Sequence, residues 1–227
     1  MTFTILNIFT TLFVNLFHTN VLAKRRFSMW ITFGAIIGFT GILAIVLFVV
    51  GIRSETSVRA ILVGSIYAIP LYYLYKVSFK KLIIIMIYCW SYTLETNAIA
   101  YGIVHILDLS NPLMYIFIIE TSLILSTIYF LFRFSRGRFT TIIEKSNRTN
   151  QNILIILGFA IFVTLVGIRF YISPHIPIYF FLLVSIMIIG WASYTLMHAI
   201  VQSNLSLTDA NKIAFKDSLT GINNRYS

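Results

Sequence analysis

Charged residues are scarce in this sequence, and their scarcity excludes an ordinary soluble domain. Only 11% of the 227 residues are Asp, Glu, Lys or Arg, against about 25% in a typical soluble domain, and 59% are hydrophobic. The one cysteine, Cys89, lies inside an apolar run, so the sequence has neither a disulfide framework nor a zinc-binding pattern. Long apolar runs with short polar connections are typical of a polytopic membrane protein.

Acidic residues are especially few. The chain has 7 Asp and Glu against 17 Lys and Arg, which gives a formal net charge of +10. A basic balance of this size can indicate nucleic-acid binding. Here, however, the basic residues form short clusters between apolar runs, which is the pattern that sets membrane topology. We therefore expect a lipid bilayer, and no nucleic acid, as the partner of this chain.

Seven apolar runs predict the fold. We expect an all-α, polytopic membrane bundle of about seven transmembrane helices, with span ends uncertain by a few residues. The predicted spans are residues 1–22, 28–52, 58–75, 82–104, 113–132, 153–172 and 178–201. A polar helix is predicted to continue from the last span as far as Lys216.

Basic residues predict the orientation of the bundle. With the N-terminus outside and the C-terminus in the cytoplasm, the outer connections hold only Arg53 and Arg59. The inner connections hold Lys24, Arg25, Arg26, Lys76, Lys80, Lys81, Arg133, Arg136, Arg138, Lys145 and Arg148. Residues 21–23 would suit a signal peptidase, but the basic cluster follows the first run instead of preceding it, so we expect that run to be retained.

Three charged residues lie inside predicted spans: Glu95, Glu120 and Arg169. A charge within a bilayer is costly and is therefore a candidate for function. All three are predicted in the outer half of the bundle. We expect Arg169 to pair with Glu120 or Glu95 in a cavity open to the outside, with Asn97 and Tyr101 nearby, as a ligand-sensing site. The alternative is that Arg169 extends alone to the membrane interface.

The last residues of the chain form a recognisable string. Residues 216–227 read Lys-Asp-Ser-Leu-Thr-Gly-Ile-Asn-Asn-Arg-Tyr-Ser. This string resembles the opening of GGDEF domains, the diguanylate cyclase family, which is written Asp-x-Leu-Thr-Gly-Leu-x-Asn-Arg-Arg. It departs from that pattern at Ile222 and Tyr226. The matching positions are Asp217, Leu219, Thr220, Gly221, Asn224 and Arg225.

The resemblance covers about a dozen residues, yet it implies a domain organisation. Residues 1–201 would be a membrane sensor domain, 202–216 a cytoplasmic signalling helix, and 217–227 the start of a truncated GGDEF domain. In the family this opening is a structural turn, so it carries no catalytic or metal-binding residue, and we expect this chain by itself neither to make cyclic di-GMP nor to hold a cofactor. The missing cyclase domain would use GTP and Mg.

The family also implies a setting. Because its product is made from two nucleotides held on two facing domains, the resemblance implies a homodimer. The expected location is a bacterial cytoplasmic membrane, where the bundle would read an unknown extracellular or membrane ligand.

Three other interpretations stay open. The spans are similar to the peptide-sensing membrane domains of quorum-sensing histidine kinases, because a basic cluster ends the first span and the fourth contains a glutamate. The bundle could instead be a passive anchor that localises and dimerises a cyclase. A transporter whose tail matches by chance would carry broken helices or an inverted repeat, and neither is visible.

Overall fold

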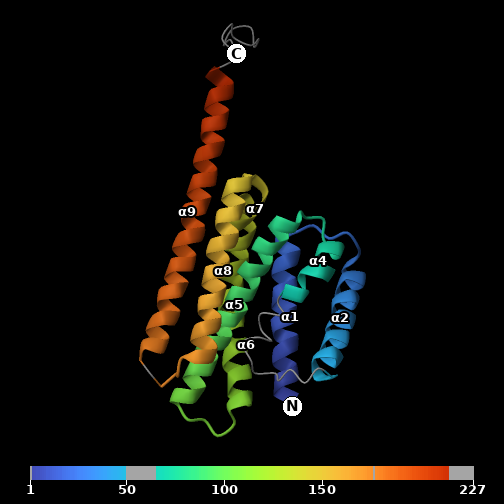
Figure 1. The fold of residues 1–227 in the computed structure, drawn as a ribbon, viewed down its shortest axis with the longest axis vertical. Helices are drawn as coiled ribbons and strands as arrows, with labels where there is room; N and C mark the ends of the chain where they lie inside the picture. Colours follow the sequence, from blue (N-terminus) through green and yellow to red (C-terminus); the bar gives the residue numbers. More distant parts are fainter. Residues whose placement is uncertain (1, 50–64, 176, 215–227) are drawn as a thin grey trace.

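Every regular element in the described part of the chain is a helix. The computed structural model describes residues 2–49, 65–175 and 177–214. The helices are α1 (Thr2–Leu22), α2 (Met29–Val49), α4 (Ala68–Leu74), α5 (Phe79–Ile106), α6 (Pro112–Phe134), the π-helical turn η1 (Ser135–Phe139), α7 (Thr140–Lys145), α8 (Arg148–Tyr171) and α9 (Ile178–Ala214). Figure 1 shows them as an upright bundle.

Five of these helices contain stretches long and apolar enough to cross a membrane: Met29–Val46, Phe79–Ile106, Pro112–Lys145, Arg148–Tyr171 and Ile178–Asn211. The predicted all-α class is therefore confirmed, and the five candidate spans support a multi-pass membrane protein. The apolar part of α1, Leu6–Leu22, is shorter. Part of the predicted third span lies outside the described residues. Its described part includes the seven-residue α4, so the count of seven spans stays a prediction.

Helix α5 is the central element of the bundle. Half of its membrane-length window is buried, against at most 33% for the other four windows. It packs against α1, α6, α8 and α9, so side chains on several of its faces are covered. The buried positions include residues such as Ile85, Cys89, Ala98 and Val104.

An aromatic cluster joins α5 to α9 near the end of α6. There the helix passes through η1, and Phe139 of this turn stacks on Tyr88 of α5 with ring centroids 4.1 Å apart. Tyr88 also shares a 3.1 Å hydrogen bond with Ser135. Tyr194 of α9 meets the Tyr88 ring edge-on at 5.5 Å. Three separate elements are thus held together by ring contacts at this level.

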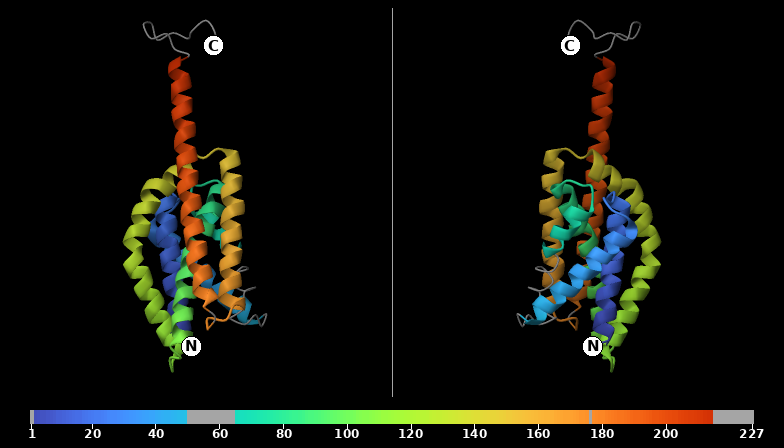
Figure 2. Two further views of the ribbon diagram at one scale, coloured as in Figure 1. Left: turned by 90° about the vertical axis from the view of Figure 1, so that its left-hand side faces the viewer. Right: turned by 90° about the vertical axis from the view of Figure 1, so that its right-hand side faces the viewer.

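Helix α9 is longer than the bundle and projects beyond it (Figures 1 and 2). Its 37 residues extend over about 55 Å at the usual α-helical rise, whereas a hydrocarbon core is about 30 Å thick. Val201 is 1% exposed, and Leu207, further along, is 60% exposed. Helix α9 therefore continues without a break past residue 201, where the predicted last span ends.

Candidate functional site

Glu120 of α6 is a buried carboxylate held by two amides. Its side chain is only 2% exposed. The Nδ2 atoms of Asn7 on α1 and Asn97 on α5 both donate to its Oε2 atom, at 2.5 and 2.7 Å. A charge buried in this way is tolerated only when such partners replace its lost hydration. The contacts join α1, α5 and α6 at one point.

Arg169 of α8 completes this network. Its Nε donates to Oδ1 of Asn97 at 3.0 Å, so one amide bridges the guanidinium and the Glu120 carboxylate. The guanidinium carbon lies 3.5 Å from the centre of the Tyr101 ring, which is a cation–π contact. Arg169 is also within electrostatic reach of Glu120. We call Asn7, Asn97, Glu120 and Arg169 the polar network.

The positions of these residues along their helices explain why they meet. Asn97 and Tyr101 are four residues apart on α5 and so share a face. Glu120 follows the start of α6 at Pro112 by eight residues, or about 12 Å. Arg169 lies in the last turn of α8, from which its long side chain reaches inward. The start of α1, the end of α5, the start of α6 and the end of α8 all lie at the end of the bundle opposite the tip of α9 (Figure 1).

The polar network joins four helices. Among the described residues, no group of three or more His, Cys, Asp or Glu side chains is placed to hold a metal ion. Its members instead cross-link α1, α5, α6 and α8 by charge-assisted hydrogen bonds. Breaking one member of a buried charged pair is strongly destabilising, so this arrangement is suited to holding one bundle conformation.

Sequence reasoning expected Arg169 to pair with Glu120 or Glu95, and the structure brings it to Glu120 through Asn97. Glu95 stands apart, since no hydrogen bond joins it to the polar network within the described residues. Its Oε1 atom is buried without a hydrogen-bond partner there, as is Oγ of Ser91 one turn earlier. Glu95 is thus a half-buried residue with one buried carboxyl oxygen that lacks a hydrogen-bond partner among the described residues.

The first turn of α9 contacts α5 next to the polar network. The hydroxyl of Tyr179, which is fully buried, donates to the backbone oxygen of Ala98 at 2.8 Å. Close approach depends on Gly102, because a Cβ added there would lie 2.7 Å from Tyr179 and 2.6 Å from Phe180. The helix that leaves the bundle is therefore anchored one residue from Asn97.

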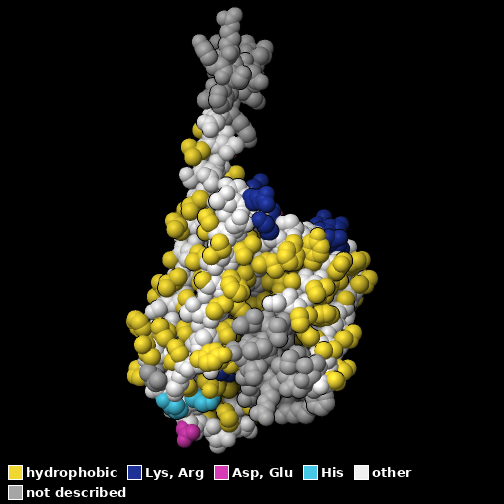
Figure 3. Space-filling model, in the orientation of Figure 1, with side chains coloured by type: hydrophobic (Ala, Val, Ile, Leu, Met, Phe, Trp, Pro, Cys, Tyr) yellow, Lys and Arg dark blue, Asp and Glu magenta, His cyan; other side chains and the backbone are white. Residues whose placement is uncertain are grey.

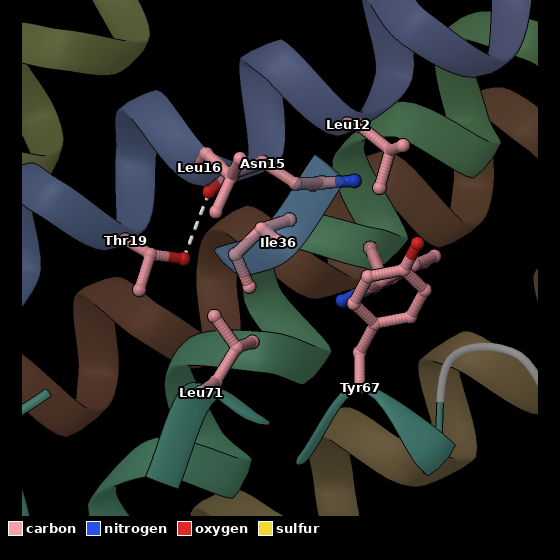
Figure 4. Close-up of a pocket in the computed structure, with 8 residues that line it drawn as sticks. Leu12, Asn15, Leu16, Thr19, Ile36, Tyr67 and Leu71 are labelled. Carbon is pink, nitrogen blue, oxygen red and sulfur yellow. Dashed lines mark hydrogen bonds between the residues drawn. The ribbon is translucent and has the colours of Figure 1, made fainter. Parts of the chain in front are cut away.

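A cavity lies elsewhere, between α1, α2, α4 and α5 (Figure 4). It is lined by Leu12, Asn15, Leu16, Thr19, Ile36, Tyr67, Leu71 and Trp90. Its volume of about 10 Å³ is no more than one water molecule needs. The Oδ1 atom of Asn15 is buried and has no partner among the described residues. None of the predicted sensing residues lines this cavity.

Two residues of the site were not assigned from the sequence. In the sequence, Asn7 is a polar residue within an apolar run, and this pattern could have identified it as a candidate site residue. From its position near the end of a predicted span, Tyr179 is expected to be an aromatic residue at the membrane interface. The neighbouring sequence does not indicate that its hydroxyl is buried. The positions that resemble the GGDEF opening, Asp217, Leu219, Thr220, Gly221, Asn224 and Arg225, lie outside the described residues.

Comparisons with protein-family models, curated proteins and solved structures found no match to this chain. Its function is therefore inferred from its own residues and geometry.

Proposed function

We propose that this chain is the membrane input domain of a GGDEF-type diguanylate cyclase. The observation that carries the proposal is the continuity of α9, which begins beside the polar network at Tyr179 and extends beyond the bundle to Ala214. Three residues later comes Asp217, the first position that resembles the GGDEF opening. A single rigid element would thus join the polar network to an output domain.

The polar network would act as a latch that holds the input domain in one state. While Glu120 is bound by Asn7 and Asn97, α1, α5 and α6 keep a fixed arrangement. A ligand or a change in the membrane that loosens these bonds would alter α5, on which Tyr179 is seated. The aromatic contact of Tyr88 with Tyr194 would carry the change to a second level of α9. Such transmission requires two discrete packings of the bundle.

The proposal includes a topology and a setting. The chain would cross a bacterial cytoplasmic membrane seven times, with its N-terminus outside and its C-terminus in the cytoplasm. Two copies would bring paired cyclase domains together, and those domains would use GTP and Mg.

The test uses the full-length protein that contains this chain. The gene is first sequenced beyond Ser227, where the proposal expects a GGDEF domain in frame. Cyclic di-GMP is then measured in cells that produce the wild type or the Glu120→Gln variant at equal membrane levels. The matched control is Glu144→Gln, which changes an exposed carboxylate on α7.

We expect Glu120→Gln to fix the output high or low, and Glu144→Gln to leave it unchanged. An output identical to the wild type in both variants would favour a passive anchor over a sensor. An unrelated continuation of the reading frame would remove the cyclase assignment itself.

A further inference from the structure

Two connections at the end of the bundle nearest the tip of α9 are joined by backbone hydrogen bonds. Arg25, between α1 and α2, forms an antiparallel bridge with Tyr75, between α4 and α5. On either side of it, N–H of Arg26 donates to the oxygen of Leu74 at 2.8 Å, and N–H of Lys76 donates to the oxygen of Lys24 at 2.7 Å. Residues 24–26 and 74–76 therefore behave as a short two-stranded ribbon, which we call the basic ribbon.

This pairing places two like charges opposite each other. Side chains alternate between the faces of paired strands, so Arg25 and Tyr75 share one face while Lys24 and Lys76 share the other. Tyr75 is fully buried and its hydroxyl donates to Asn20 at 3.0 Å, which turns its face toward the core. Lys24 and Lys76 are exposed on the opposite face. Cβ atoms at such positions are about 5 Å apart, where like charges repel.

Arg26 adds a third cation that is fixed in place. Its Nε donates to the backbone oxygen of Tyr75 at 2.9 Å, so the guanidinium lies against the ribbon. No Asp or Glu occurs in residues 20–31 or 70–83, so neither connection supplies a compensating charge of its own. The fold keeps the cations together although their mutual repulsion opposes it.

Exposed aromatic side chains place the basic ribbon at the depth of lipid headgroups. Trp30, at the start of α2, is 85% exposed, and Tyr73, near the end of α4, is 67% exposed. Such aromatics favour the membrane interface, where an apolar ring and a polar edge are both accommodated. Figure 3 shows Lys and Arg side chains in two separate patches at the end of the bundle from which α9 projects.

We propose that the basic ribbon binds the headgroup of an anionic phospholipid, with its phosphate between Lys24 and Lys76. A negative group at that point relieves the repulsion between the two ammonium groups and provides acceptors for their N–H donors. Basic sites between transmembrane helices at this level are a recognised mode of lipid binding. The inference is independent of the proposed output domain, since it depends only on residues 24–26 and 74–76.

The experiment uses the purified chain in nanodiscs of phosphatidylcholine alone or with phosphatidylglycerol. Native mass spectrometry counts retained lipids, and thermal unfolding gives Tm. The test variant is Lys24→Gln/Lys76→Gln. The control, Lys145→Gln/Arg148→Gln, removes two exposed basic residues flanking the α7–α8 connection. We expect phosphatidylglycerol to raise the Tm of the wild type and of the control by several degrees and to be retained by both. The test variant should show neither the rise in Tm nor the retained lipid.

A second variant keeps the inference falsifiable if the double variant fails to insert. Lys76→Glu places a carboxylate opposite Lys24, so we expect a higher Tm in phosphatidylcholine than the wild type shows, and no further rise with phosphatidylglycerol. Equal retention of phosphatidylglycerol by the wild type and the test variants would overturn the proposal. Displacement of the lipid by millimolar inorganic phosphate would also overturn it, because the site would then take a soluble phosphate.

Discussion

The side-chain amide of Asn97 donates a 2.7 Å hydrogen bond to the buried carboxylate of Glu120. The same amide accepts from Arg169 through its oxygen, so its orientation is fixed from both sides. A bridging amide can serve an anion and a cation at once only because it carries a donor and an acceptor on one planar group.

Asn97→Ala therefore removes a donor from Glu120 and an acceptor from Arg169. Hydrogen bonds to charged groups are worth about 1.5–3 kcal/mol each, so losing both should lower the free energy of unfolding by about 3–6 kcal/mol. Thermal unfolding in detergent measures the change. Asn152→Ala is the control, since Asn152 only accepts from Lys80 at the surface and its loss should cost little. Equal Tm values for the two variants would contradict the central role of Asn97.

Glu95 and Glu120 should respond in opposite directions to the same substitution. Glu120→Met leaves two amides without their shared acceptor, and we expect Tm to drop. Glu95→Met removes a buried oxygen that has no hydrogen-bond partner among the described residues, so Tm should stay the same or rise. Thermal unfolding of the two variants, measured in parallel, tests this prediction. A larger drop in Tm for Glu95→Met than for Glu120→Met would contradict the hydrogen bonding described for these two residues.

Gly102→Ala should disturb the packing of the first turn of α9 against α5. The added methyl group would lie within 2.7 Å of the Tyr179 and Phe180 rings, so α9 or the rings must move, at a cost of about 1–3 kcal/mol. Gly167→Ala on α8 is the matched control, because nothing lies within 4 Å of its added Cβ. Alanine is the better helix former, so the control should be neutral or slightly stabilising. A neutral Gly102→Ala would show that α9 is not closely packed there.

Tyr179→Phe should weaken the link between the polar network and α9 without opening a cavity. The lost hydrogen bond to Ala98 corresponds to about 1 kcal/mol of stability. In the full-length protein, we expect the response of cyclic di-GMP to Glu120→Gln to shrink when Tyr179→Phe is added. Tyr129→Phe, on an exposed face of α6, is the control. If the cyclic di-GMP response to Glu120→Gln were unchanged by Tyr179→Phe, the signal would not pass through the Tyr179 contact with α5.

The membrane class and the association of the sensing residues could be predicted because both follow from strong energetic rules. Apolar runs must span a bilayer, and charges within them must find partners. Glu120 and Arg169 were expected to lie close together, and Asn97 bridges them. Their sensing role stays a prediction. The role of Asn97 as the bridge depends on how α5 is rotated about its axis relative to α6 and α8. That rotation is set by packing of apolar faces that look alike in sequence.

Glu95 shows the limit of the same reasoning. It has the same residue type and similar expected depth as Glu120, but its buried Oε1 atom has no hydrogen-bond partner among the described residues. The pairing of residues 24–26 with 74–76 was also beyond sequence reasoning, because two short basic connections carry no strand pattern. Long-range pairings of this kind depend on where the neighbouring helices end.

The uninterrupted length of α9 has a mechanical consequence. A straight helix pivoting near Tyr179 acts as a lever, and every degree of tilt displaces its far end at Ala214 by about 1 Å. α9 stays packed as far as Val201, about 33 Å from Tyr179, so a tilt that moves the tip by about 1 Å moves this packed level by about 0.6 Å. Any tilt that the packing of α9 allows is therefore largest at Ala214, beyond the last contact with the bundle.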